Sequence, residues 1–181
     1  MGKSEGNLIR LDMLDTKGVH PLAYRYFVLG AHYRTKLNFI WEAVRAADNA
    51  LQKIYAEARE LVAPKGKCIN FEKKFNAAID DDLNTPQALA VVWEMLKSSS
   101  PPAAKAASLL KFDKVLGLDI KKYLGKKIKA PKEVLELVKK REEARKKKDW
   151  KSADKLRAEI ERMGFEIEDT KDGAKINSQF T

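Results

Sequence analysis

Hydrophobic side chains recur at spacings of three and four residues along most of this chain, which is the pattern of amphipathic helices. The clearest stripe is formed by Leu22, Tyr26, Leu29 and Tyr33. Pro21 precedes this stripe, and proline suits the first turn of a helix because the N–H that it lacks would have no partner there. The first predicted helix therefore begins at Pro21.

The same periodicity predicts four more helices before residue 118, over about 38–62, 71–80, 86–97 and 103–116. Proline, glycine and serine stand at most of the breaks between them. Thr85 is the expected N-cap of the third of these helices, and Gly117 is expected to end the fourth. Helices of this length joined by short breaks favour antiparallel packing. Residues 19–118 are therefore predicted to form a helical bundle.

The pattern changes after this bundle. Residues 119–130 are rich in lysine and glycine and are expected to form a linker. Residues 131–181 combine two helical stretches, the second of which closes at Gly164, with an alternation of apolar and polar residues over 165–168. A turn at 171–173 allows the chain to return as a β-hairpin. The predicted fold class is thus mainly all-α: an antiparallel helical bundle with a small basic helix-hairpin appendage that ends in a short β-hairpin.

Nearly all of the surplus positive charge lies toward this appendage. Between Lys121 and Arg162 the chain has seventeen basic and eight acidic residues, so this segment has a net charge of +9. The whole 181-residue chain has a net charge of +10. A local basic field of this kind attracts polyanions. Trp150 and Asp154 stand inside it, which favours contacts to bases as well as to phosphates. A solvated, lysine-rich helix face is the alternative that charge alone leaves open.

Composition excludes several classes of protein. A hydrophobic content of 44% with 34% charged residues is ordinary for a soluble, helix-rich protein. No apolar run approaches the ~20 residues that cross a bilayer, and the polar start at Met1 does not resemble a signal peptide. A single cysteine, Cys68, excludes an internal disulfide and a cysteine-built zinc site. We therefore expect a cytoplasmic protein with no membrane partner, in which Cys68 is a plain thiol.

No catalytic constellation stands out in the sequence. His20, His32 and Cys68 are too far apart to form a local signature. The acidic run at 80–82 could bind a divalent cation, but successive side chains at a helix end point in different directions. Capping and solvated charge are therefore the expected role of this run, and no metal site is predicted. His32 is expected to be a hydrogen-bonded packing residue.

Three stretches of the chain resemble cysteinyl-tRNA synthetases. They read PLAYRY, AHYR and LNF within 21–39, DDDLNTPQAL over 80–89, and RKKKDW with the following AD, R, MG and ED within 145–169. They occur in the order and spacing of that family, and the resemblance covers essentially the whole chain. It implies the C-terminal part of the family's fold: a helical bundle of the class I synthetase anticodon-binding type, and an anticodon-recognition domain over 131–181.

The first residues resemble the end of the family's KMSKS loop, which runs on into a Gly-Asn pair. The resemblance matches Lys3 to the second lysine of that loop, which stabilises charge developing on the phosphates of ATP. The first lysine of the signature is absent, and Gly2 stands where serine is usual. Residues 1–18 are interpreted as the remnant of this loop with a connecting helix. The nucleotide-binding fold, the HIGH motif and the zinc-binding cysteines of the family are not found in this sequence.

The resemblance also assigns residues that bind RNA. An arginine, a tryptophan and two aspartates that contact anticodon bases in the family match Arg145, Trp150, Asp154 and Asp169. Unpaired bases stack on aromatic faces and expose their hydrogen-bonding edges, which suits these side chains. The alternative is that Trp150 packs at the helix junction while the two aspartates serve as cap and turn residues. Adjacent lysines would contact phosphates: Lys146, Lys147 and Lys148.

The family resemblance implies a parent enzyme that joins cysteine to tRNA-Cys with ATP and Mg²⁺ and selects the cysteine thiol with Zn²⁺. For this chain it implies tRNA-Cys and the absent catalytic domain as partners, and no cofactor of its own. One alternative is the same region of a cysteine ligase that acts on a sugar amine, which would not need the basic tail. Another is a stand-alone helical RNA-binding or protein-interaction adaptor. An exposed apolar face on the first two helices would favour that adaptor, but it is equally expected of a bundle without its catalytic domain.

We expect the purified chain to be catalytically inactive by itself, because Lys3 is the only residue matched to the family's ATP-activating machinery. ATP–pyrophosphate exchange in the presence of cysteine should not exceed the background measured with a Lys3→Ala variant. Exchange above that background would contradict this expectation.

Overall fold

The computed structural model describes residues 11–126, 128, 130–170 and 173–178, and Lys3 lies outside them. The chain divides into two units, Met1–Lys126 and Lys127–Thr181. The first unit contains α1 (Asp12–Thr16), α2 (Pro21–Leu29), α3 (Trp41–Glu60), α4 (Ile69–Asp80), α5 (Thr85–Lys97), α6 (Pro102–Leu116) and the short 3₁₀ helix η2 (Ile120–Lys122). The second contains α7 (Lys132–Lys146), α8 (Trp150–Arg162), β1 (Phe165–Thr170) and β2 (Gly173–Ser178). The mainly helical fold class is confirmed.

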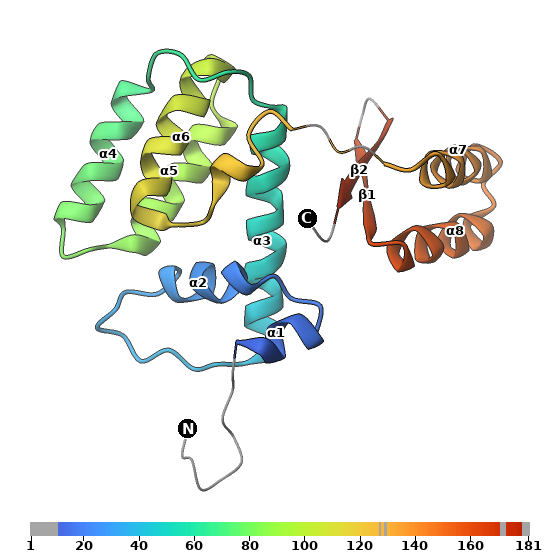
Figure 1. Cartoon of the computed structure of the whole chain (residues 1–181), viewed down its shortest axis with the longest axis horizontal. Coiled ribbons are helices and arrows are strands. Elements are labelled where there is room, and N and C mark those ends of the chain that lie inside the picture. Colours follow the sequence, from blue (N-terminus) through green and yellow to red (C-terminus); the bar gives the residue numbers. More distant parts are fainter. Residues whose placement is uncertain (1–10, 127, 129, 171–172, 179–181) are drawn as a thin grey trace, which may run out of the picture. The chain divides into compact units, whose positions relative to one another are not determined.

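In the first unit α4, α5 and α6 lie side by side, and α3 lies beside them and contributes side chains to the same core (Figure 1). The largest fully buried side chains of its core include Leu51, Tyr55, Phe75, Leu109 and Phe112. A smaller cluster formed by Leu14, Val19, Ala23 and Val44 joins α1 and α2 to α3. None of the described helices is long and apolar enough to cross a membrane.

Two local expectations in this unit differ from the structure. The stripe through Tyr33 predicts a longer first helix, but α2 ends at Leu29 and Tyr33 lies in the following loop. The N-cap of α5 is Asn84, whose side-chain oxygen accepts a hydrogen bond from the N–H of Gln87 at 3.2 Å. Thr85 is instead the first helical residue. Asparagine caps a helix as well as threonine does, and here it stands one residue earlier.

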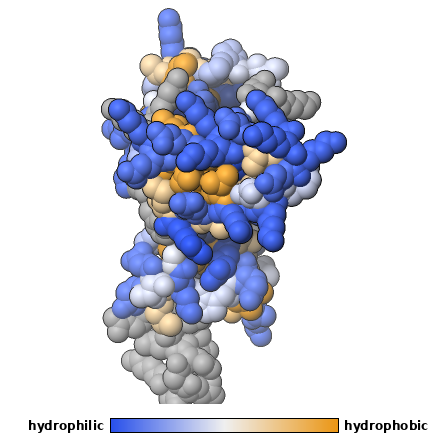
Figure 2. Space-filling model, turned by 90° about the vertical axis from the view of Figure 1, so that its right-hand side faces the viewer, coloured by the Kyte–Doolittle hydropathy of each residue, from blue (hydrophilic) through white to orange (hydrophobic). Residues whose placement is uncertain are grey.

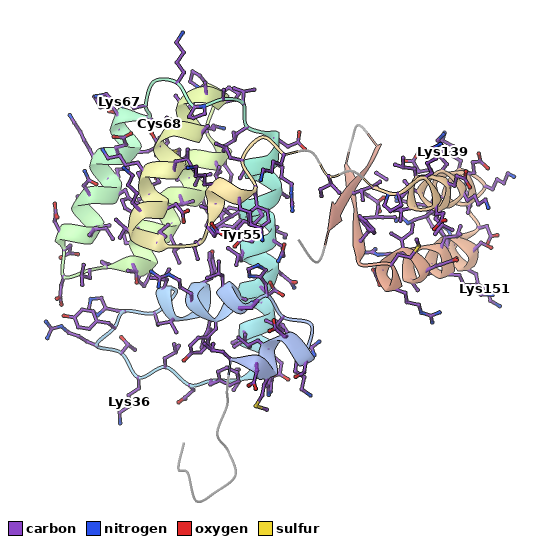
Figure 3. All side chains as sticks on the ribbon, in the orientation of Figure 1. Lys36, Tyr55, Lys67, Cys68, Lys139 and Lys151 are labelled. Atoms are coloured by element: carbon purple, nitrogen blue, oxygen red, sulfur yellow. The ribbon has the colours of Figure 1, made fainter. Side chains whose placement is uncertain are left out.

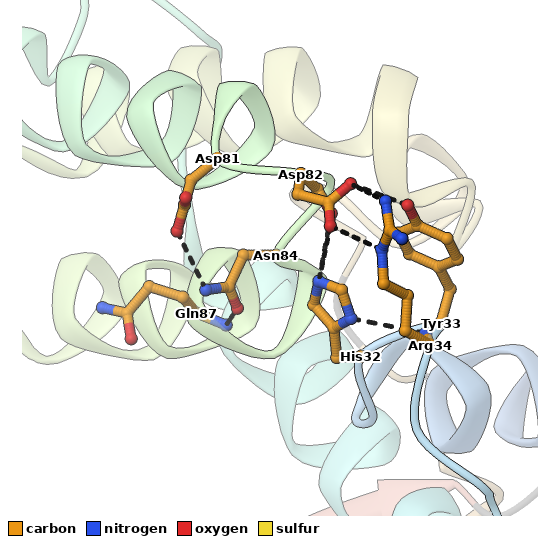
Figure 4. Close-up of polar contacts among 7 residues, drawn as sticks. All are labelled: His32, Tyr33, Arg34, Asp81, Asp82, Asn84 and Gln87. Atoms are coloured by element: carbon orange, nitrogen blue, oxygen red, sulfur yellow. Dashed lines mark hydrogen bonds and ion pairs between the residues drawn. The ribbon is translucent and has the colours of Figure 1, made fainter.

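The loop after α2 is attached to the turn between α4 and α5 by Asp82 (Figure 4). Its carboxylate accepts hydrogen bonds from the Tyr33 hydroxyl at 2.7 Å and from Nε of Arg34 at 2.8 Å. Nε2 of His32 lies 3.1 Å from the backbone oxygen of Asp82, while Nδ1 of His32 accepts from the Arg34 N–H. His32 is thus hydrogen-bonded, as predicted. The Arg34 guanidinium and the Tyr33 hydroxyl lower the pKa of Asp82.

Cys68 precedes α4 and is buried (Figure 3). Its backbone N–H donates to Oγ of Ser108 at 2.8 Å, and that hydroxyl donates to Oε1 of Glu72 at 2.8 Å. The other oxygen of Glu72 accepts from Nζ of Lys111 at 2.7 Å. This chain of hydrogen bonds satisfies a largely buried carboxylate and connects α4 to α6.

The first unit continues past α6 into the segment for which composition predicts a linker. Ile120 and Tyr123 are buried in the bundle core. The Tyr55 hydroxyl donates to the backbone oxygen of Leu118 at 2.7 Å, and its ring stacks on that of Tyr123 with centroids 3.7 Å apart. Asp113 accepts from the N–H groups of Leu118 and Ile120 at 2.7 and 2.9 Å. These contacts hold the chain to α3 and α6 until close to the boundary at Lys126.

The second unit packs α7 against α8 and closes with the antiparallel hairpin β1–β2, in which Ile167 pairs with Ile176. Its core is small and is formed by Val134, Val138, Ile160 and Ile167 with partly buried neighbours. The predicted hairpin is confirmed, and its turn at residues 171–172 lies outside the described residues. The turn between α7 and α8 places Lys148 at φ +58°, and the chain leaves α8 through Gly164 at φ +81°.

Gly117 is required at the end of α6 for two reasons. Its φ is +62°, and an added Cβ would lie 2.9 Å from the guanidinium of Arg25, which donates to the carbonyl of Leu116. We expect Gly117→Ala to lower the free energy of unfolding by about 2–3 kcal/mol, because backbone strain adds to the loss of the Arg25–Leu116 hydrogen bond when the guanidinium moves aside. Urea denaturation of the full chain measures this change.

Gly66→Ala is the matched control, because Gly66 also has a positive φ (+80°) but an added Cβ there would meet no atom closer than 4.0 Å. Its expected loss is about 1–2 kcal/mol, from backbone strain alone. Equal losses for the two variants would show that the contact with Arg25 does not contribute.

Candidate nucleic-acid interface

The residues predicted to contact RNA all belong to the second unit, where the structure describes each of them. Arg145 and Lys146 form the last turn of α7, Lys147 and Lys148 lie in the turn that follows, and Trp150 begins α8. Asp154 lies one turn further along α8, and Asp169 lies on β1. The fold therefore brings one end of α7, the start of α8 and one strand together.

Asp169 is the most constrained of these residues. Its two carboxylate oxygens accept hydrogen bonds from Nη1 and Nη2 of Arg141, each at 2.9 Å. Nη1 of Arg145 also forms an ion pair with Asp169. One carboxylate is therefore shared by two guanidinium groups, and β1 is held to α7 by a two-pronged ion pair.

Arg141 is the residue of this cluster that the sequence interpretation missed. It is 4% exposed, which is unusual for an arginine, and its Nε has no hydrogen-bond partner among the described atoms. A signal was present in the sequence, because Val134, Val138, Arg141 and Arg145 follow one another at spacings of four, three and four. An arginine on the apolar stripe of a helix is directed toward the core, where it needs an acidic partner.

The ion pair shifts the titration of both partners. Hydrogen bonding from Arg141 is the main cause that holds the pKa of Asp169 below its usual value, and Arg145 adds to this shift. Hydrogen bonding to Asp169 in turn raises the pKa of Arg141, and the charges of Glu142 and Asp154 act in the same direction. Asp154 therefore contributes to the electrostatic field at Arg141.

The turn between the two helices is built by Asp149, whose side chain caps α8 by accepting from the Ser152 N–H at 3.1 Å. Hydrogen bonding from the Ser152 side chain, followed by that from its backbone N–H, lowers the pKa of Asp149. The side chain of Trp150 follows directly and is 58% exposed. The packing of Trp150 at the helix junction, which the sequence left open as an alternative, would have buried more of this ring. An exposed indole beside basic residues is instead free to contact a ligand.

The lysines of this region are solvent-accessible. Lys146, Lys147 and Lys148 are exposed, as are Lys139 and Lys151, which extend away from α7 and α8 (Figure 3). Seen from the side of these helices, the surface is mostly hydrophilic (Figure 2). This end of the unit therefore presents exposed lysines, the exposed ring of Trp150 and one half-buried guanidinium, that of Arg145. This combination suits an extended polyanion that also carries planar groups.

The described residues do not offer a site for the zinc ion that the family resemblance implies. Among them, no group of three or more histidine, cysteine, aspartate or glutamate side chains lies close enough together to hold a metal ion. Asp82, the member of the acidic run that faces another segment, is engaged by Tyr33 and Arg34 instead.

Comparison with known proteins identifies both units. Residues 129–176 match the family model of the cysteinyl-tRNA ligase anticodon binding domain, and residues 74–121 match that of the DALR domain. The first match contains every residue of the candidate interface and Arg141, and the second contains Asp82 and the cap of α5.

Curated proteins similar to this chain are cysteine–tRNA ligases. Cysteine–tRNA ligase 1 of Burkholderia lata is 41% identical over 180 residues, which cover 97% of this chain and 37% of the relative. The cysteine–tRNA ligase of Opitutus terrae is 38% identical over 97% of this chain and 38% of the relative, and that of Thermus thermophilus is 34% identical over 97% and 42%. The chain thus spans about two fifths of the length of these relatives.

Removing the charge of Asp169 should destabilise the second unit. In Asp169→Asn the buried Arg141 keeps its charge without a carboxylate, and we expect a loss of about 1–2 kcal/mol at pH 7, less than for a fully buried pair because Asp169 is one-third exposed. The lowered pKa of Asp169 means that the parent keeps this contribution above about pH 4 and loses it as the pH falls further. The difference between the two proteins should therefore shrink at pH 3.

Hydrogen exchange of the α7 and β1 amides in the full chain measures this difference. The exposed Asp154→Asn is the control and should change the stability by less than about 0.5 kcal/mol. A difference that is the same at pH 7 and pH 3 would show that the ion pair is not its source.

Proposed function

Since the chain belongs to the cysteine–tRNA ligase family, we propose that it binds the anticodon stem-loop of tRNA-Cys through its second unit. The observation that carries this proposal is that the candidate RNA-binding residues lie within the segment that matches an anticodon binding domain. The match to an anticodon binding domain, over 129–176, contains the exposed Trp150, the lysines of the turn and the Arg141–Asp169 ion pair.

Trp150 stacks on an unpaired base of the loop in this proposal. Its ring is exposed and stands at the start of a helix whose cap, Asp149, fixes the backbone. Stacking of one base on an aromatic side chain contributes about 1–3 kcal/mol. Every base has a flat face, so this contact favours single-stranded RNA, and differences in stacking strength between bases make it sensitive to which base occupies that position.

Discrimination among RNA bases is assigned mainly to charged side chains, some of which have restricted conformational freedom. Asp154 is exposed on α8, where its carboxylate can accept hydrogen bonds from a base edge and repels phosphate. The guanidinium of Arg145 is half-buried and paired with Asp169, so its direction is restricted before any RNA binds. Asp169 completes this group, although both of its oxygens are already engaged by Arg141.

Lys146, Lys147 and Lys148 contact phosphates. Their side chains are exposed, and flexible ammonium groups that neutralise phosphates release counterions and make binding depend on salt. Such contacts hold the RNA without reading it.

We further propose that this binding serves the attachment of cysteine to tRNA-Cys. The relatives are named for that reaction, and the resemblance implies that it uses ATP, Mg²⁺ and Zn²⁺. The described residues of this chain are assigned to binding tRNA. A catalytic domain of the same family is the proposed partner for the chemistry.

Binding of the full chain to a tRNA-Cys anticodon stem-loop, and to a loop with one anticodon base changed, tests the proposal at two salt concentrations. Trp150→Ala and Asp154→Ala should each reduce the preference for the matched loop, by an amount equivalent to about 1–3 kcal/mol. Lys147→Ala should weaken both RNAs equally and reduce the salt slope by about one. Equal losses of affinity for both loops in all three variants would contradict the assignment of Trp150 and Asp154 to base contacts. A parent chain that binds the matched and the changed loop equally well would contradict the proposed function itself.

A further inference from the structure

We infer that Arg141, which is not itself available to RNA, is the positioning residue of the anticodon-reading surface: its buried, two-pronged ion pair fixes Asp169, and through Asp169 it fixes Arg145. This inference rests on the function proposed above and adds a residue that the family resemblance did not supply. It concerns how the surface is assembled before RNA arrives.

Geometry places Arg141 at the centre of the residues assigned to base reading. Nη1 and Nη2 each donate to a different oxygen of Asp169 at 2.9 Å, so the carboxylate can neither rotate nor swing away without breaking both bonds. Arg145 pairs with that same carboxylate, and Asp154 lies near enough for its charge to act on Arg141. Two of the four residues assigned to base reading, Asp169 and Arg145, are therefore held by this one buried side chain, directly or through the shared carboxylate.

Stability alone does not explain an arginine at this position. Arg141 lies on the apolar stripe of α7 between Val138 and Arg145, it is 4% exposed, and its Nε has no partner among the described atoms. Replacing a buried ion pair with apolar side chains is often neutral or stabilising, whereas a polar atom left without a partner costs free energy. What an apolar residue could not supply is a fixed orientation of Asp169.

A fixed orientation has a direct consequence for binding. Long charged side chains lose rotamer freedom when they bind, at about 0.5–1.5 kcal/mol each, and a group that is already held in place avoids this cost. Nη1 of Arg145 faces Asp169, which leaves the other N–H groups of this half-buried side chain to meet acceptor atoms on a base. Arg141 thus improves selection without touching the RNA.

The decisive experiment combines Arg141→Met with Asp169→Asn in the full chain. Methionine fills a similar volume without the charge. We expect Arg141→Met to reduce the ratio of affinities for the matched and single-base-changed anticodon stem-loops by about tenfold, with little change in the salt slope because the buried Arg141 contacts no phosphate. In an Asp169→Asn background the same substitution should change the ratio less than about twofold, because its effect passes through Asp169.

Lys139→Met is the matched control, since it removes one positive charge from the exposed surface of the same helix. It should weaken both stem-loops alike and leave their ratio unchanged. Arg141→Lys keeps the charge but lacks the planar fork, so it should restore only part of the ratio. This second variant also carries the test if Arg141→Met does not fold, as judged by its amide spectrum.

A measurement independent of RNA is an NMR titration that follows the Asp169 carboxyl carbon. In Arg141→Met the pKa of Asp169 should rise toward the ordinary aspartate value. An unchanged affinity ratio in a folded Arg141→Met or Arg141→Lys would overturn the inference, and so would an equal loss in the Asp169→Asn background. If the parent chain does not distinguish the two loops, the proposed function fails and this inference fails with it. A discriminating parent with an unaffected Arg141 variant overturns the inference alone.

Discussion

The second unit contains a buried charged side chain, Arg141, whose pairing with Asp169 the surrounding structure depends on. Its hydrophobic core is formed by four buried side chains and a few partly buried neighbours, which is little for an independent fold. The ion pair between Arg141 on α7 and Asp169 on β1 therefore joins the helices to the hairpin where apolar contact is scarce. The same carboxylate also pairs with Arg145, so the contact that joins α7 to β1 is the one proposed to orient the RNA-binding surface.

The first unit is stabilised differently from the second. Its large apolar core carries the stability, and polar contacts are used to fix loops: Asp82 attaches the loop after α2, and Arg25 covers the end of α6. Each of these guanidinium or carboxylate groups closes a turn whose backbone could otherwise adopt several paths. The two units thus differ in what their ionic contacts join: in the first unit they fix loops beside a large apolar core, and in the second they connect α7 to β1 beside a small one.

Local signals in the sequence located most of the fold. Pro21 opens α2, Gly117 ends α6 and Gly164 follows α8, because each residue has a backbone preference that acts without knowledge of the tertiary structure. The failures concern long-range packing. The lysines beside Ile120 and Tyr123 suggest a solvated linker, but the two apolar side chains find the core of the bundle.

The burial of Arg141 was not predicted from the sequence because it too depends on long-range packing. Within a run of charged residues it reads as one more solvated cation, and its burial depends on an aspartate 28 residues further along the chain. The family resemblance supplied Arg145, Trp150, Asp154 and Asp169, but not Arg141, the residue proposed to orient two of them. The sequence thus yields a proposal for the positions that contact RNA, whereas the burial of Arg141 and its pairing with Asp169 required the structure.

The backbone of Lys148 shows a conflict between two demands on one residue. At φ +58° its Cβ is crowded by the neighbouring carbonyl, and a residue other than glycine gives up about 1–2 kcal/mol in that conformation. A sequence optimised only for folding would carry glycine at this turn. Glycine at position 148 would relieve this strain but would remove one of the exposed cations proposed to contact phosphates, so stabilising redesign of this unit should leave that turn untouched.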